Sequence, residues 1–210
     1  EALFAAFKRR ETFGTSGNRI SIRLFAGWDY PANLAAAVDA IDTAYNEGVP
    51  MGATLAVTGQ RSAPGLLVWA AQDPAAQPLQ RLQIIKGWMD TSGELREYTY
   101  DVACADGMAV DEETHRCPDN GAGVDLSNCS TTGESGASQL ATVWRDPEFD
   151  PKQSAFYYAR VLENPSCRWS TYDVLASDGA IAPAYPVPEV IQERAWSSPI
   201  WLQAAGVAAP

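Results

Sequence analysis

The chain contains a single histidine, His115, which limits the chemistry that its side chains can perform. A Ser-His-Asp or Cys-His site needs an imidazole as general base, so it would have to be built around this one residue. No Gly-x-Ser-x-Gly motif is present, and a metal site with several histidines is impossible within this chain. We therefore predict no catalytic residue and no metal ligand here, and interpret His115 as a loop residue.

A turn of small residues offers the second candidate for chemistry. Residues 14–18 read Gly-Thr-Ser-Gly-Asn and are followed by Arg19. Two hydroxyls and a guanidinium suit an oxyanion such as phosphate or sulfate. Many turns between a helix and a strand have this composition, and the Gly-rich motifs of nucleotide sites are absent. Thr15, Ser16 and Arg19 are the candidate substrate contacts.

The four cysteines are spaced too widely for a CxxC zinc or redox motif. An even number, three of them in a polar loop, predicts two disulfides and an oxidising compartment, either periplasmic or extracellular. Three pairings are possible. We favour Cys104 with Cys117, which closes a short loop, and Cys129 with Cys167, which ties a long insertion to a later strand.

The acidic and aromatic residues each have a simple interpretation. Acidic residues crowd the cysteine-rich loop, where oxygen ligands could bind calcium, but the EF-hand order is absent, so a solvated loop is favoured over calcium. Seven tryptophans and eight tyrosines could include a sugar-stacking platform. Most tryptophans lie in strand patterns, which favours packing. The acidic residues of the loop are Asp106, Asp111, Glu112, Glu113, Asp119 and Asp125.

The net charge of −11 argues against nucleic acid and anionic membranes as partners. Acidic residues outnumber basic ones by 26 to 15, and the only basic cluster is at residues 8–10. The longest apolar runs fall far short of a membrane span. Neutral, cationic or metal-bound partners remain open.

The elements that would position these residues are mostly strands. Residues 1–10 and 31–47 have helical spacing, the second with Gly48 as its C-cap. Residues 90–93 read as a hairpin turn and 103–139 as a long loop. Strands divided by Pro and Gly predict an antiparallel β-sandwich-like fold with one additional helix after the N-terminal one. The predicted strands are 20–25, 54–57, 65–71, 79–86, 97–102, 139–144, 155–162, 168–174 and 196–202.

Several segments resemble the C-terminal part of a bacterial family of unknown function. Full-length members of that family join a metal-binding barrel of the PHP (polymerase and histidinol phosphatase) type to a β-rich region. The resemblance follows the family's order along nearly the whole chain. It is carried by residues 1–20 (EALFAAFKRRETFGTSGNRI), 24–29 (LFAGWD), 48–52 (GVPMG), 82–88 (LQIIKGW), 156–172 (FYYARVLENPSCRWSTY) and 193–201 (ERAWSSPIW).

The resemblance implies a metal-dependent phosphoester or sulfate-ester hydrolase whose divalent metal lies in a barrel outside this chain. Residues 1–20 would be the last helix and strand of that barrel, residues 21–203 a β-rich domain, and residues 204–210 a flexible tail. The turn at 14–19 would then lie near the active-site mouth. This chain would support the barrel and be inactive alone. The alternative is a self-sufficient secreted module that binds a carbohydrate or a protein.

Overall fold

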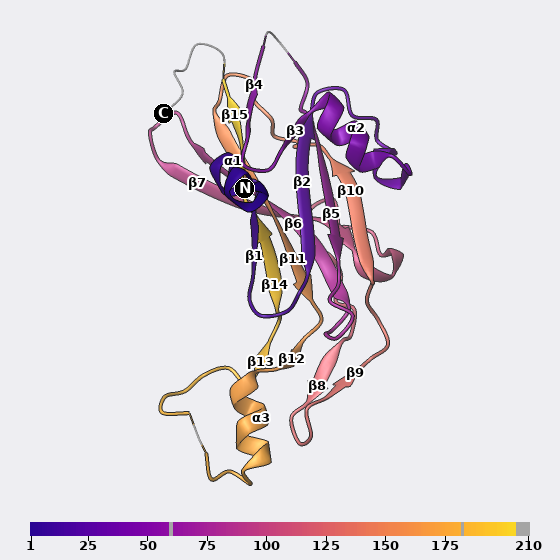
Figure 1. The fold of residues 1–210 in the computed structure, drawn as a ribbon, viewed down its shortest axis with the longest axis vertical. Coiled ribbons are helices and arrows are strands. Elements are labelled where there is room, and N and C mark those ends of the chain that lie inside the picture. The colour runs from indigo at the N-terminus through magenta and orange to yellow at the C-terminus, as the bar shows by residue number, and fades with distance from the viewer. Residues whose placement is uncertain (59–60, 182, 205–210) are drawn as a thin grey trace.

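The structure, a computed structural model, describes residues 1–58, 61–181 and 183–204. Its strands form two main sheets, one of seven strands and one of four, that pack face to face (Figure 1). The buried apolar residues of the main core come from both sheets. The fold is therefore mainly β and an antiparallel sandwich, as the strand pattern predicted. The described residues form three α-helices, one more than expected.

The seven-stranded sheet is built around β11. One edge of β11 pairs along its length with β6, which continues into β7 through the predicted hairpin turn. The other edge is shared by β14 and β15, which pair in turn with β1 and β4. Only β4–β15 is parallel among the described ladders of this sheet. Its strands are β1 (Phe13–Thr15), β4 (Thr54–Ala56), β6 (Leu79–Met89), β7 (Leu95–Cys104), β11 (Ala155–Glu163), β14 (Arg194–Ser197) and β15 (Ile200–Gln203).

The four-stranded sheet supplies the other half of the core. Ile22 and Leu24 of β2 point between the sheets and are fully buried, while Arg23 between them is exposed. This alternation is the period-2 pattern of a half-buried strand. The strands, in spatial order, are β10 (Gln139–Trp144), β5 (Gly65–Ala71), β2 (Ser21–Gly27) and β3 (Val49–Pro50).

A buried ion pair lies among these core residues. Lys86 Nζ is 2.6 Å from Asp146 Oδ2, and both side chains are almost fully buried. Tyr157 donates its hydroxyl to the same carboxylate at 2.6 Å, and the Lys86 ammonium also donates to the Glu148 carbonyl at 2.9 Å. Because each group has partners, neither charge is left uncompensated.

The helix predicted over residues 31–47 is divided in two. A 3₁₀ turn, η1 (Leu34–Ala36), and α2 (Ala40–Glu47) are separated by Ala37, whose backbone is extended. Leu34 of η1 packs into a second cluster with Phe25 and Leu67, so burial of this side chain replaces the continuous helix. Gly48 is also extended rather than a left-handed cap. A Cβ there would lie 2.0 Å from the Tyr30 hydroxyl, so close approach is what requires glycine.

Two strand predictions near the C-terminus were wrong in detail. Residues 168–174 begin a helix, α3 (Trp169–Ala176), rather than a strand. Its aromatic residues Trp169 and Tyr172 are three apart, which is a helical spacing. The helix satisfies its own backbone, and Thr171 donates to the Glu189 carbonyl at 2.8 Å. The strand predicted at 196–202 is interrupted by Ser198 and Pro199, which separate β14 from β15.

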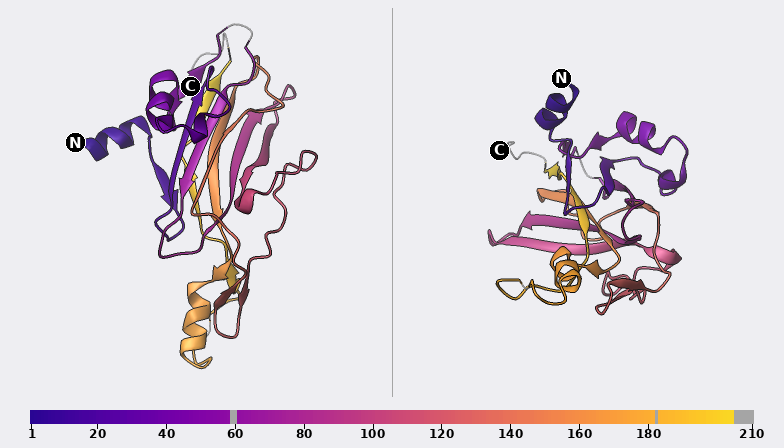
Figure 2. Two further views of the ribbon diagram at one scale, coloured as in Figure 1. Left: turned by 90° about the vertical axis from the view of Figure 1, so that its right-hand side faces the viewer. Right: turned by 60° about the horizontal axis from the view of Figure 1, so that its bottom comes forward.

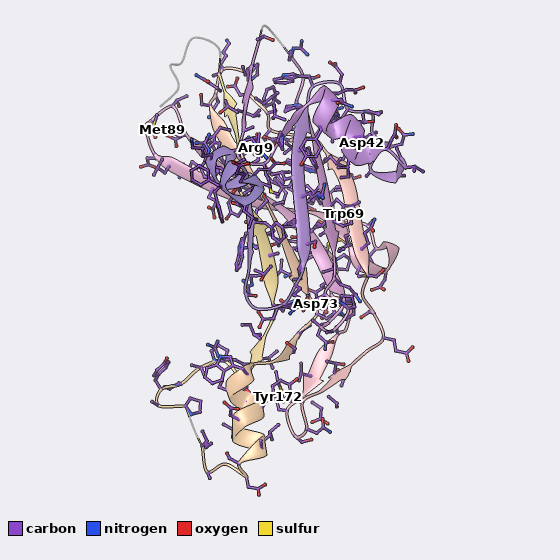
Figure 3. All side chains as sticks on the ribbon, viewed as in Figure 1. Arg9, Asp42, Trp69, Asp73, Met89 and Tyr172 are labelled. Carbon is purple, nitrogen blue, oxygen red and sulfur yellow. A yellow bond between two sulfur atoms is a disulfide. The ribbon has the colours of Figure 1, made fainter. Side chains whose placement is uncertain are left out.

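The long loop at 103–139 contains short elements and forms part of a narrow extension below the sandwich (Figures 1 and 2). Tyr172 on α3 lies in this extension, far from the two sheets (Figure 3). Both predicted disulfides are present, Cys104–Cys117 and Cys129–Cys167, and the second joins β9 to β12. The short elements of the loop are η2 (Ala105–Gly107), β8 (Gly123–Asp125) and β9 (Ser130–Thr132). The later segment contributes β12 (Ser166–Cys167), α3 and β13 (Val190–Ile191).

The N-terminal helix α1 (Ala2–Arg9) projects from the sandwich (Figure 2). It ends at Arg10, whose left-handed backbone donates back to the helix in a capping turn. The following residues belong to the sandwich, because β1 pairs with β14 and Ile20 lies in the core. The barrel origin of residues 1–20 stays a prediction. In the predicted tail, Ala204 is buried and its N–H donates a hydrogen bond to Ser154 Oγ at 3.1 Å. Residues 205–210 lie outside the described residues.

Candidate functional site

The turn at residues 14–19 crosses from the seven-stranded sheet to the four-stranded sheet. Ser16 is held to β14 from both sides: its N–H donates to the Arg194 carbonyl at 3.0 Å, and its Oγ accepts from the Arg194 N–H at 2.9 Å. The same hydroxyl donates to the Glu193 carboxylate. Thr15 is exposed at the end of β1, and the exposed Arg19 donates its N–H to Asp73 Oδ2 at 2.8 Å.

A buried carboxylate lies behind this turn. Glu163, at the end of β11, is only 1% exposed and accepts a hydrogen bond from the Asn18 side-chain amide. Its Oε1 and the Oδ1 of Asn18 are buried without a hydrogen-bond partner. Burial above all, with the nearby charges of Glu193 and Asp73, raises the pKa of Glu163 to about 7, against hydrogen bonds from Gln77 and Asn18 that lower it. The group can therefore hold a proton near neutral pH.

The environment of the turn is thus acidic. Glu163, Glu193 and Asp73 all face it, and their field disfavours an anionic ligand at this point. The role of Thr15, Ser16 and Arg19 as substrate contacts stays a prediction. Sequence reasoning missed Asn18 and Glu163, because the residues that surround them are distant in the chain. Only the placement of Asn18 within a Gly-rich turn could have suggested a side-chain hydrogen bond.

An apolar groove of about 740 Å³ lies where β6, β7, β11 and β15 meet. Phe156 lies flat over Gly87, where a Cβ would approach its ring to 2.1 Å. The guanidinium of Arg10 stacks 4.8 Å from the ring centre of Trp201, and its Nε donates to the Gly52 carbonyl at 3.2 Å. Other side chains that line the groove are Trp88, Met89, Leu95, Arg96, Glu97 and Leu202.

Helix α1 presents an apolar face next to this groove. Leu3 is 78% exposed, Phe4 65% and Phe7 66%, and no residue of the helix is buried. The spacing of these three residues places them on one side of the helix. Large apolar side chains gathered in this way are typical of a surface that another molecule or domain covers.

His115 has a structural position. Its ring packs against Tyr100 and Tyr98, and its carbonyl accepts from the Asp101 N–H at 3.0 Å, which fixes the loop to the edge of β7. Two acidic residues of the loop stabilise turns: hydrogen bonds from Thr114 lower the pKa of Asp111, and hydrogen bonds from Ser127 lower that of Asp125. These carboxylates already accept hydrogen bonds within their own turns.

The remaining findings concern the whole chain. No helix in the described ranges has the length and apolar character of a membrane span. The two disulfides suggest a non-cytoplasmic location. Among curated proteins and among solved structures, none matches this chain. A family model described as "Protein of unknown function (DUF3604)" matches residues 1–204. The match covers nearly the whole chain, and the protein therefore belongs to the DUF3604 family.

Proposed function

We propose that this chain is the C-terminal portion of an exported, metal-dependent hydrolase of phosphate or sulfate esters. It would support a catalytic barrel of the PHP type in the same protein, and it would be inactive alone. The resemblance of the segments quoted above supports the reaction class. The disulfides support export, and we propose the periplasm or the outside of the cell as its location.

The observation that carries this proposal is the uncovered apolar face of α1. Leu3, Phe4 and Phe7 are all largely exposed in the described part of the chain, where the Phe4 ring contacts only the Lys8 ammonium of the same helix, 5.3 Å from the ring centre. A self-sufficient module would be expected to pack such a helix onto its own core, whereas a domain that supports a barrel would use it as a contact. The residue that ends this helix, Arg10, also lines the apolar groove.

The divalent metal would be held by the barrel. In the described residues, no group of three or more His, Cys, Asp and Glu side chains could hold a metal ion, so this chain does not fit the ligand set that such a hydrolase needs. We therefore assign it no step at the metal. Its part would be to complete and position the barrel.

Activity assays test this proposal directly. Residues 1–210 and a version extended upstream by the encoded barrel are compared on 4-nitrophenyl phosphate and 4-nitrophenyl sulfate with Mn²⁺, Zn²⁺ or Mg²⁺. We expect metal-dependent turnover only from the extended protein. Turnover by residues 1–210 alone, or none by the extended protein on any ester, would contradict the proposal.

A paired substitution tests the role of α1. Replacing Phe4 and Phe7 by Ser is expected to leave the melting temperature of residues 1–210 unchanged, because neither side chain is buried. In the extended protein the same change is expected to lower both stability and turnover. Val38→Ser, at a fully exposed residue between η1 and α2, is the control. An extended protein that tolerates the paired change as well as the control would argue against docking through α1.

A second candidate function, carbohydrate binding, is favoured by the composition of the groove. Trp88, Trp201 and Phe156 line one depression, and aromatic rings of this kind can stack on sugars. Calorimetric titration with soluble oligosaccharides tests it. Binding that Trp201→Ala abolishes, while Trp169→Ala on the distant α3 does not, would establish the module.

A further inference from the structure

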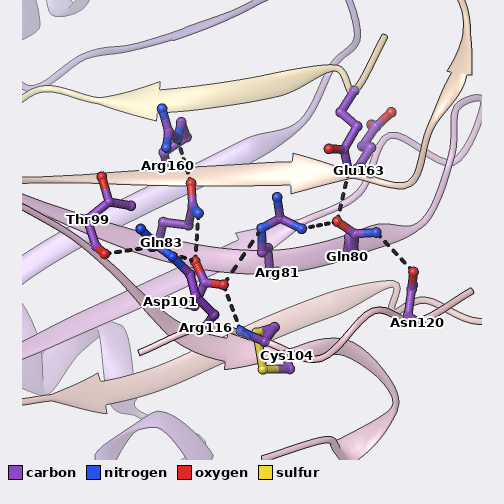
Figure 4. A network of polar contacts seen from close by, with 12 residues as sticks. Gln80, Arg81, Gln83, Thr99, Asp101, Cys104, Arg116, Asn120, Arg160 and Glu163 are labelled. Carbon is purple, nitrogen blue, oxygen red and sulfur yellow. Dashed lines mark hydrogen bonds and ion pairs between the residues drawn. A yellow bond between two sulfur atoms is a disulfide. The ribbon is translucent and has the colours of Figure 1, made fainter. Parts of the chain in front are cut away.

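Three arginines lie together on the outer face of the seven-stranded sheet. Leu162 of β11 pairs with Arg194 of β14 on one side and with Arg81 of β6 on the other. Arg160 precedes Leu162 by two residues and therefore points to the same face. Figure 4 shows Arg160 and Arg81 on neighbouring strands. Burial lowers the pKa of Arg160. The charge of Tyr158 opposes this shift, the charges of Arg194 and Arg81 add to it, and the charge of Glu97 opposes it.

Neutral groups, rather than carboxylates, hold these guanidiniums in place. Arg160 Nε donates to Gln83 Oε1 at 2.7 Å, and Arg194 Nε donates to the Gln192 carbonyl at 3.0 Å. Arg81 donates to the side-chain oxygen of Gln80. Within the described residues neither Arg160 nor Arg194 forms an ion pair. Each of these two guanidinium groups is therefore held in one orientation, and its charge is left available for a ligand.

Two carboxylates, Asp101 and Glu97, act on this group, and Asp101 is already shared. Asp101 is buried and lies 3.9 Å from Arg81 and 3.7 Å from Arg116. It also accepts hydrogen bonds from the Gln83 amide at 2.6 Å and from the Cys117 N–H at 2.8 Å (Figure 4). Asp101 and Glu97 together face four guanidiniums, so this face carries a local positive excess on a chain whose net charge is −11.

Donors also exceed acceptors here. Among the described residues, neither the buried Nε of Arg81 nor that of Arg168 has a hydrogen-bond partner. Arg168 and Arg194 together line a shallow depression of about 480 Å³, whose other lining residues, among those described, are Gln192 and apolar side chains. Trp196 lies beside Arg160 in the β11–β14 register, and its ring centre is 6.0 Å from the Arg194 guanidinium.

We infer that Arg160, Arg194 and Arg81 form an oxyanion site that takes a phosphate or sulfate group. Tetrahedral oxyanions offer oxygens to several guanidiniums at once, and Arg160 and Arg194, which are anchored at Nε, keep their terminal N–H groups for such a ligand. The site stands on residues of this chain. Only its assignment to the ester group of the substrate rests on the proposed function.

Anion titration of residues 1–210 tests the site. Binding of inorganic phosphate and of sulfate is measured by calorimetry at constant ionic strength, with chloride and acetate as competing salts. Arg160→Gln and Arg194→Gln are each expected to weaken phosphate binding by about tenfold or more. Arg194→Lys is expected to be intermediate, because it keeps the charge and loses the fork. Arg23→Gln, on the exposed face of the other sheet, is the matched control and should bind as the unchanged protein does.

The outcomes separate this inference from the proposed function. Phosphate and sulfate that bind no better than chloride, or a loss equal in Arg23→Gln and Arg160→Gln, overturn the site even if the extended protein hydrolyses esters. Selective binding that Arg160→Gln removes supports the site even if the extended protein shows no hydrolysis. Circular dichroism of each variant establishes that a loss of binding does not come from unfolding.

Discussion

Replacing Glu163 by Gln should remove the pH dependence of stability that this buried carboxyl group imposes. The pKa of Glu163 is raised from about 4.5 to about 7 in the folded chain. Between these values the folded state holds a proton that the unfolded state has released. The free energy of unfolding must therefore fall as pH rises from about 4.5 to about 7, the opposite of the usual ion-paired carboxylate.

The size of the effect follows from the shift. A difference of about 2.5 pH units, at about 1.4 kcal/mol for each unit, corresponds to about 3 kcal/mol between the two ends of this window. Gln has nearly the same shape and no charge. The Glu163→Gln variant should match the unchanged protein near pH 4.5 and exceed its stability by about 3 kcal/mol at pH 8. For a chain of this length that is a rise in melting temperature of about 6–12 °C.

Thermal unfolding at pH values from 4.5 to 8 measures this difference. Glu193→Gln is an informative companion, because removing that charge lowers the pKa of Glu163 and should move the upper end of the window to lower pH. Glu112→Gln, in the exposed loop, serves as the control for loss of a carboxyl group. A stability difference between Glu163→Gln and the unchanged protein that stays constant with pH, or that grows as pH falls, would refute the reasoning.

Three further changes have definite expected results. Gly87→Ala should cost about 1–3 kcal/mol in urea unfolding, because the phenyl ring above it must move, whereas Gly14→Ala, with open space at its Cβ, should be tolerated. Cys167→Ser, which opens the disulfide to β9, should cost about 2–5 kcal/mol and make the segment around α3 the first site of limited proteolysis. Lys86→Met should cost about 3–5 kcal/mol in urea unfolding, because it leaves Asp146 buried without its cation.

The sequence predicted those parts of the fold that depend on local pattern. β5 and β10 were predicted at their observed bounds, because alternation and flanking Gly or polar residues mark their ends. α3 was missed because Trp169 and Tyr172 favour strands, and only the absence of a pairing partner decides for a helix. The disulfide pairing was predicted because loop length alone favoured it.

The candidate sites depend on which strands pair and in which register, and neither can be inferred from a single sequence. Arg160 and Arg194 become neighbours only when β11 pairs with β14. Asn18 meets Glu163 only because the turn after β1 crosses the end of β11. Reasoning from local sequence instead selected Thr15, Ser16 and Arg19, which are close together in the sequence. It could not detect the carboxylates that surround them in the fold.

The pairing of β1 with β14 constrains how the chain can fold as it is made. Phe13 pairs with Ser197, so the first strand finds its neighbour only after nearly the whole chain has been synthesised. The edge of β11 that pairs with β15 likewise stays unpaired until β15 has been synthesised. Contacts between such distant residues are slow to form, and the unpaired edges stay open to other chains meanwhile. A nascent or exported chain that stops short of β14 would therefore lack a closed sheet, and we expect it to depend on chaperones until the last strands arrive.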